Sequence, residues 1–181
     1  ARSLYGTYSK TMSVYNLPFN LMIPLTACIV PAVSAALTKK DKVGAGKIAE
    51  PALRVGAMLA LPAGIGLTVL AGPIIQLLYP ETNQEVGTQC LMVLGIASIF
   101  VCLMLVCNSV LQAHGFINLP VVIMALGGVV KIVTNYNLVA VPTIGISGAP
   151  VGNVLCFGLC MVLDLVVIAR VIHGRPDYLP L

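Results

Sequence analysis

The distribution of charge constrains this chain more than any other feature, because four long stretches contain no Asp, Glu, Lys or Arg. They are residues 11–38, 55–80, 86–130 and 132–163. A helix needs about 20 mostly apolar residues to cross the hydrocarbon core of a bilayer. Each stretch is therefore long enough for one helix, and the third for two. The chain is 59% hydrophobic and 9% charged, with a mean hydropathy of +1.01, whereas soluble domains carry roughly 25% charged residues. The sequence thus predicts a membrane protein.

The third stretch is interrupted by His114, Gly115, Asn118 and Pro120, which together favour a turn. We therefore predict an all-α fold, a polytopic membrane helix bundle with five transmembrane helices. The expected spans are residues 11–37, 52–79, 89–113, 119–141 and 146–171.

Lys and Arg residues distinguish the two sides of the membrane, because short cytoplasmic loops collect positive charge. Seven of them fall on one side when five helices are threaded: Lys39, Lys40, Lys42, Lys47, Arg54, Arg170 and Arg175. The opposite side has Arg2 and Lys10. We expect a multi-pass protein of the cell membrane, with the N-terminus of this segment outside and the C-terminus in the cytoplasm.

The predicted orientation suggests that residues 1–181 are a piece of a longer polytopic protein. The sequence starts without Met, and no charged-then-apolar signal segment precedes the first span. An odd number of spans, the first already crossing inward, fits the same interpretation. We therefore expect a missing part of the same protein to be a partner, together with membrane lipid.

Motifs typical of enzymes are missing from the sequence. It contains no G-x-S-x-G, no P-loop and no H-E-x-x-H. The six cysteines all lie in predicted spans and form no Cys-x-x-Cys pair, so we interpret them as small packing residues rather than a metal or redox site. We expect no catalytic activity, no cofactor, no metal and no nucleic-acid partner.

Polar residues recur along single faces of the predicted spans. On the first, Ser9, Ser13, Asn16 and Asn20 are spaced i, i+4, i+7 and i+11, which is one helix face. Polar groups at this depth are costly unless they face a partner helix or water. Interhelical hydrogen bonds, worth about 0.6 kcal/mol each, would explain a single Asn or Ser. Stripes on several helices favour a hydrated cavity. Later spans repeat the pattern with Asn108 and Gln112, Lys131 and Asn135, and Asn153, Cys160 and Asp164.

Lys131 is the candidate of greatest interest because it is placed deep in its predicted span. It lies eight to ten residues from the outer end, or about 12–15 Å, and a lysine stem of roughly 6 Å does not cover that distance by snorkelling. A water-filled cavity would keep the ammonium hydrated, and an anionic ligand there would bind to it. Asn135, one turn away, could hydrogen-bond the same ligand. Pairing with an acid from the missing part of the protein is the alternative.

Prolines interrupt the predicted helices at several points. Pro18, Pro24 and Pro31 lie in the first span and Pro62 in the second. A proline inside a membrane helix frees a carbonyl and permits a bend, and transporters use bent helices to line a substrate path. We predict that these four prolines act in gating, although proline is also common in membrane helices in general.

Several segments, in order, carry a family resemblance: "YGTYSKTMSVYNLPFNLMIPLTACIVPAVSAAL", "LPAGIGLTVLAGPIIQLLYP", "NSVLQAHGFINLPVVIMALGGVVKIVTNYNLV" and "IGISGAPVGNVL". They resemble the MurJ/SpoVB-type branch of the MOP (MATE-like) exporter superfamily, which includes lipid II and polysaccharide flippases. The resemblance covers nearly the whole chain. It implies that residues 1–181 are helices eight to twelve of about fourteen, and so a partial C-terminal lobe of a two-lobe transporter.

The resemblance also implies a function, the export of a lipid-linked sugar pyrophosphate by alternating access. Lys10 lies near the position of a basic substrate residue in lipid II flippases. The expected substrate-binding residues are thus Lys10, Asn16, Asn20, Lys131 and Asn135. Two alternatives stay open: a MATE-type drug or cation antiporter, and a non-transporting membrane scaffold for envelope assembly. Several arginines in the missing half would favour a flippase, and a lone membrane aspartate there would favour an antiporter.

Overall fold

The chain folds into a bundle of helices. The computed structural model describes residues 2–39, 42–80, 84–139 and 149–173, and this part of the chain contains six helices and no strand. The helices are α1 (Arg2–Thr38), α2 (Lys42–Val69), α3 (Ala71–Leu78), α4 (Gln84–Ala113), α5 (Asn118–Val139) and α6 (Ala149–His173). The predicted all-α bundle with five spans is confirmed. The segments long and apolar enough to cross a membrane are Gly6–Thr38, Ile48–Val69, Gln84–Ala113, Asn118–Asn137 and Pro150–Arg170.

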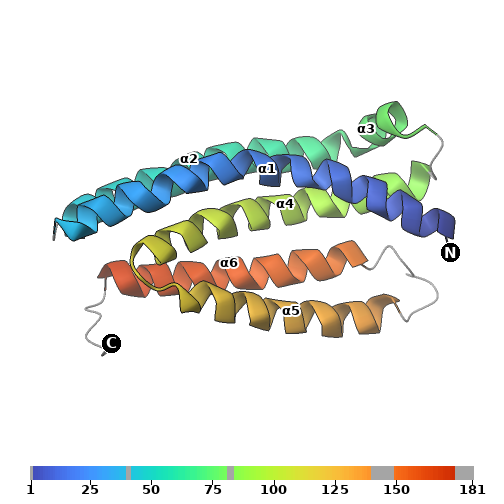
Figure 1. Ribbon diagram of the computed structural model, residues 1–181. Coiled ribbons are helices and arrows are strands. Elements are labelled where there is room, and N and C mark those ends of the chain that lie inside the picture. The colour runs from blue at the N-terminus through green and yellow to red at the C-terminus, as the bar shows by residue number, and fades with distance from the viewer. Residues whose placement is uncertain (1, 40–41, 81–83, 140–148, 174–181) are drawn as a thin grey trace.

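The second predicted span, residues 52–79, is divided in the structure. α2 ends at Val69, and Leu70 leaves the helical conformation with φ −91° and ψ 12° before α3 begins. α3 packs mainly against α4, at the end of the bundle where α1 begins (Figure 1). Its buried residues, Ala71 and Ile75, pack in a cluster with Leu91 of α4. The expected span ends at residues 141 and 146 lie outside the described residues.

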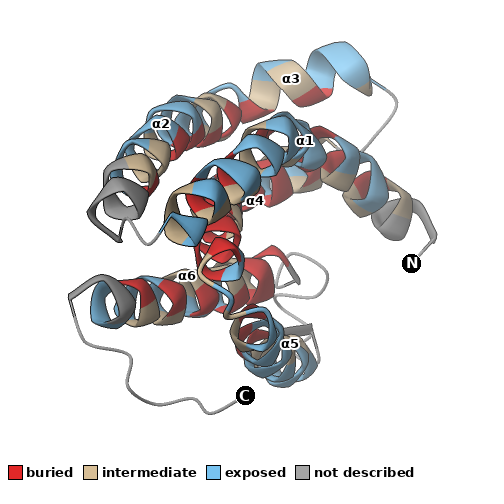
Figure 2. Ribbon diagram, turned by 60° about the vertical axis from the view of Figure 1, so that its left-hand side comes forward, coloured by how far each residue is buried: buried red, intermediate tan, exposed pale blue. Residues whose placement is uncertain are grey.

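α4 is the central helix of the bundle. α1 and α2 pack together on one side of it and α6 packs on the other, while α5 packs mainly against α6 (Figures 1 and 2). α1, α4 and α6 run in one direction, and α2 and α5 run in the other (Figure 1). Because neighbours surround α4, it is buried on most sides, which explains why its sequence is apolar all round.

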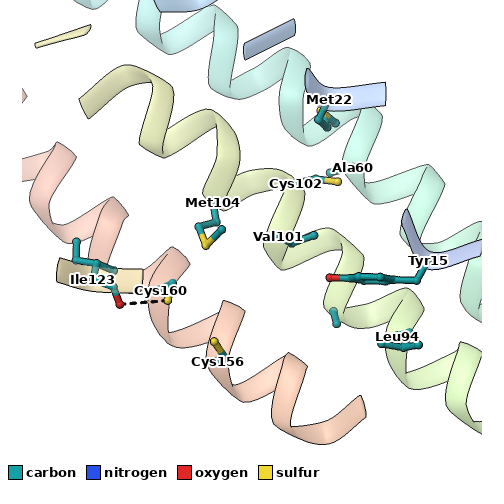
Figure 3. Packing of buried hydrophobic residues seen from close by; sticks show 11 residues of the cluster. Tyr15, Met22, Ala60, Leu94, Val101, Cys102, Met104, Ile123, Cys156 and Cys160 are labelled. Atoms are coloured by element: carbon teal, nitrogen blue, oxygen red, sulfur yellow. Dashed lines mark hydrogen bonds between the residues drawn. The ribbon is translucent and has the colours of Figure 1, made fainter. Parts of the chain in front are cut away.

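The core of the bundle forms where α1, α2 and α6 meet α4. Residues from all four helices share one buried cluster (Figure 3). α2 and α4 approach closely because both carry glycine at the contact: a Cβ atom added to Gly64 would lie 2.8 Å from the carbonyl oxygen of Gly95. Ile123 adds α5 to the cluster, whose labelled members are Tyr15, Met22, Ala60, Leu94, Val101, Cys102, Met104, Ile123, Cys156 and Cys160.

Candidate functional site

The polar stripe of α1 lies on the face that points away from the rest of the bundle. Its four residues, Ser9, Ser13, Asn16 and Asn20, are all exposed. The buried face of the same helix is centred on Thr11, Pro18 and Met22, among others. With about 100° between successive residues, the two faces lie on opposite sides of α1.

The two asparagines of this stripe form no hydrogen bond within the described part of the chain. Ser13 is partly satisfied, because its hydroxyl donates to the carbonyl oxygen of Ser9 at 3.3 Å. Interhelical hydrogen bonds within this bundle therefore do not account for Asn16 and Asn20. Their amides need either water or another protein surface, since lipid satisfies neither donor nor acceptor.

The prolines predicted to kink the first span are accommodated without breaking it. α1 is one continuous helix through Pro18, Pro24 and Pro31. Pro18 is buried against the bundle, whereas Pro24 and Pro31 are exposed on the outward side of α1. Pro62, predicted to act in the same way, is exposed inside α2. Each proline removes one backbone hydrogen bond. The hydrogen bonding of these helices is therefore interrupted at one buried position and at three exposed positions.

Lys131 lies against α6. It is half-buried, and its Nζ atom is 5.9 Å from the centroid of the Phe157 ring, a cation–π arrangement. α5 continues to Val139, eight residues (139 − 131) after Lys131. That distance is about 12 Å along the helix, which lies within the range expected from the sequence.

Asn135 lies one turn beyond Lys131 and is inserted against α6. Its Oδ1 atom touches the Cα position of Gly152 so closely that a Cβ atom there would collide with it. The same Oδ1 atom is buried and accepts no hydrogen bond. Lys131 and Asn135 thus place a cation and an amide one turn apart where α5 meets α6.

Glycine sets the close contact between α5 and α6 that positions these two side chains. A Cβ atom on Gly127 would collide with the sulfur of Cys160 and lie 3.1 Å from that of Cys156. The Cys160 thiol in turn donates to the carbonyl oxygen of Ile123 at 3.5 Å (Figure 3). The cysteines of α6 thus pack into the groove of α5, as predicted for small packing residues.

Lys10 points toward α3. Its Nζ atom lies 5.3 Å from the centroid of the Tyr79 ring, just past the end of α3. The side chain is otherwise exposed. This contact ties the N-terminal part of α1 to the residue after α3, and α1 begins at the end of the bundle where α5 finishes (Figure 1).

Apart from Lys10 beside Tyr79, the structure groups the predicted site residues in two places. Asn16 and Asn20 lie on the outer face of α1, and Lys131 and Asn135 lie between α5 and α6. α4 and α6 separate the two groups, because α1 packs on α2 and α4 whereas α5 packs on α6. Sequence reasoning missed the ring partners of the lysines, Phe157 and Tyr79. No periodicity pairs an aromatic residue with a lysine on another helix.

Other polar side chains are enclosed in the bundle. Asn153 and Asp164 of α6 are almost fully buried, and neither makes a side-chain hydrogen bond; the hydroxyl of Tyr15 and Oδ1 of Asn108 also lack partners. Asn153 and Asp164 share the α6 face predicted from their spacing. Within the described residues no group of three or more His, Cys, Asp or Glu is placed to hold a metal ion.

Comparison with known proteins identifies one family that matches nearly the whole chain. The sequence model of the family described as "Lipid II flippase MurJ" matches residues 4–176. A "Probable lipid II flippase MurJ" of Rickettsia prowazekii (strain Madrid E) is 24% identical over 148 residues, which cover 77% of this chain and 28% of that protein. The chain therefore spans less than a third of the length of this curated relative.

A solved structure has the same fold. It is the inward-facing conformation of a multidrug resistance MATE family transporter of the MOP superfamily, with a TM-score of 0.70 and 20% sequence identity. The match covers 98% of this chain and 43% of that transporter. With the fold of a MOP superfamily transporter and a family match over nearly its whole length, this multi-pass membrane chain belongs to the lipid II flippase MurJ family.

Proposed function

We propose that this chain forms part of the C-terminal lobe of a flippase that moves a lipid-linked sugar pyrophosphate, of the lipid II class, across the cell membrane. The observation that carries the proposal is the polar stripe of α1, which points away from the lobe and opposite its buried face. In a lipid-facing helix such a stripe would be unfavourable. Facing a second lobe across water, it lines a path for a polar headgroup.

The α1 stripe supplies the hydrogen-bonding part of this path. Asn16 and Asn20 each present an amide with donors and an acceptor that the lobe itself leaves free. Sugar hydroxyls need such mixed partners. The apolar chain of the substrate stays in the bilayer beside exposed apolar residues such as Leu17 and Leu21, which flank the stripe.

Lys131 supplies the charge for the pyrophosphate. Its ammonium is held over Phe157 by a contact that leaves its three N–H donors available, and Asn135, one turn away, carries amide N–H donors that suit phosphate oxygens. Charge-assisted hydrogen bonds to phosphate oxygens are among the stronger ones in proteins. Lys10, on the same end of the bundle, extends the positive character toward the surface.

Alternating access requires α1 to change its shape or its angle to the bundle. Pro18, Pro24 and Pro31 each remove a backbone hydrogen bond from this one helix. The exposed prolines lie on the side of the stripe, and so the helix can flex where the substrate passes. Pro62 offers a similar point in α2.

We further propose the orientation predicted from the charges, with the first residue of α1 outside. Lys39 follows α1 and Arg170 lies in the last turn of α6, and both helices finish at the end of the bundle where α2, with Arg54, begins. α1, with Lys10, and α4, with Glu85, begin at the other end (Figure 1). The excess of positive charge at the first end favours the cytoplasm. Lys131 and Lys10 then belong to the outer half of the path, where a flipped headgroup is released.

The antiporter alternative has one observation in its favour, the fold shared with a MATE transporter. Such a likeness at 20% identity supports the architecture and not the substrate. A scaffold without transport would have no use for an outward polar stripe. The flippase is therefore the function that the lobe supports best.

The decisive test replaces the stripe. The double variant Asn16→Leu with Asn20→Leu keeps the helix apolar and compatible with lipid while removing both amides. We expect it to be made and inserted normally but to leave the lipid-linked precursor in the inner leaflet. The matched control is Met58→Ala with Ile65→Ala, exposed residues of α2 outside the stripe, which should keep activity. Full activity of the double Asn variant would refute the proposed path.

A further inference from the structure

Asp164 of α6 is a carboxylate enclosed in the lobe. Its exposed fraction is 0%, and both carboxylate oxygens are buried without any hydrogen bond. It takes part in no ion pair; the ion pair found among the described residues joins Arg54 and Glu50 at the surface. The helices of this chain alone enclose Asp164, so its burial needs no other part of the protein.

Among the described residues, no positively charged side chain pairs with Asp164. One turn before and after it on α6 lie Cys160 and Ile168, both buried. The ionisable groups that interact electrostatically with the carboxylate are the thiols of Cys160 on its own helix and Cys107 on α4. No ionisable side chain from the described parts of α1, α2 or α5 acts on it.

An ionised carboxylate without a counter-charge is very costly in such an environment, so the group must bind a cation or take up a proton. A metal ion needs several oxygen ligands. Among the described residues Asp164 belongs to no group of three or more potential metal ligands, and its ionisable neighbours are thiols. A proton is the cation that needs no further ligand.

We propose that Asp164 is a proton-binding site at the contact between α4 and α6, and that loss of the proton loosens this contact. A charge created between two packed apolar faces draws in water or separates the faces. α5 packs mainly on α6, so a shift of α6 carries α5 and Lys131 with it. The site is separate from the α1 stripe and does not depend on the proposed substrate.

Infrared difference spectroscopy on the full chain in proteoliposomes tests the bound proton directly. A protonated carboxyl in an apolar site gives a carbonyl stretching band that an ionised carboxylate lacks. We expect the band at neutral pH in the parent protein, its complete loss in Asp164→Asn, and its retention in the control Glu50→Gln. A parent protein without the band, or a band unchanged in Asp164→Asn, would overturn the proposal.

A second arm separates a proton from an alkali ion. The band should stay the same when sodium is replaced by choline, because a proton needs no sodium. A band that grows when sodium is removed would mean that an alkali ion binds the carboxylate, against the proposal. If Asp164→Asn fails to fold, Asp164→Glu keeps a carboxyl, and its band should shift in frequency; an unshifted band would assign the signal to another residue and reject the site.

The loosening is tested by alkylation of Cys107 with a membrane-permeant maleimide. Raising the pH should increase the labelling rate more in the parent than in Asp164→Asn, whose thiol experiences the same change in pH without the charge. Equal increases would reject the loosening step. Because both readouts are independent of flipping, loss of the proposed flippase function would leave their interpretation intact.

Discussion

The ammonium of Lys131 on α5 lies over the ring of Phe157 on α6, 5.9 Å from its centroid. The contact joins two helices that glycine brings close together. It also lets a half-buried cation rest inside a membrane span without a carboxylate beside it, since a cation–π contact is worth about 2 kcal/mol when desolvated. The charge thus remains available for an anionic ligand.

Replacing Lys131 tests its role in holding the pyrophosphate. Hydrogen bonds to charged groups contribute about 1.5–3 kcal/mol, so Lys131→Gln should weaken substrate binding by about tenfold to a hundredfold and abolish complementation at equal protein level. Lys131→Arg keeps the charge and should retain part of the activity. If the Gln variant supports growth and flipping like the parent, Lys131 is not a substrate contact.

A lysine paired with an acid elsewhere in the protein would behave differently. In that case Lys131→Gln would leave a buried acid unpaired and lower the thermal stability of the full protein. A substrate contact would leave stability nearly unchanged. Thermal unfolding in detergent therefore distinguishes the two readings.

The adjacent glycines Gly127 and Gly128 make a matched pair for testing the contact between α5 and α6. A methyl group on Gly127 would meet Cys156 and Cys160, whereas one on Gly128 would meet nothing within 4 Å. Gly127→Ala should destabilise the protein by about 1–3 kcal/mol through overpacking. Gly128→Ala should be neutral or stabilising by up to about 1 kcal/mol, because alanine favours a helix. Equal unfolding temperatures of the two variants would contradict the close contact.

The sequence predicted the fold better than the site, for a physical reason. Long charge-free stretches directly indicate segments that lie in lipid, because crossing a bilayer requires uninterrupted apolar helices. The division at Leu70 was missed since residues 55–80 are apolar throughout, and hydropathy is unchanged where α2 ends and α3 begins. Tertiary packing against Leu91, not composition, positions α3.

For the site, helical spacing identified faces but not what they touch. The spacing of Asn16 and Asn20 predicted a common face, and that face is exposed. The same reasoning grouped Asn153 with Asp164, which the structure encloses against α4. Whether a polar face points outward or inward depends on which neighbouring helix covers it. The sequence of one helix does not determine which neighbour that is.

Proline positions in α1 provide a test of gating. Pro18 is buried and Pro24 is exposed on the outer side. If the weakened helix allows bending, Pro18→Ala and Pro24→Ala should each reduce flipping more than membrane insertion, because alanine restores the missing hydrogen bond and stiffens the helix by up to about 3 kcal/mol. The ratio of flipping rate to inserted protein is the measurement. Equal losses of both quantities would assign the prolines to folding alone.

The last prediction concerns the orientation of the lobe. Lys39 follows α1 at one end of the bundle and Glu85 begins α4 at the other, and both are exposed. If positive charge marks the cytoplasmic side, a membrane-impermeant maleimide added to intact cells should label Glu85→Cys and should label Lys39→Cys only after permeabilisation. The parent protein serves as the control for background, since its own cysteines lie within the helices. Labelling of position 39 from outside intact cells would invert the lobe. Lys131 and Asn135 would then lie near the cytoplasmic entrance of the path, where the headgroup is first captured.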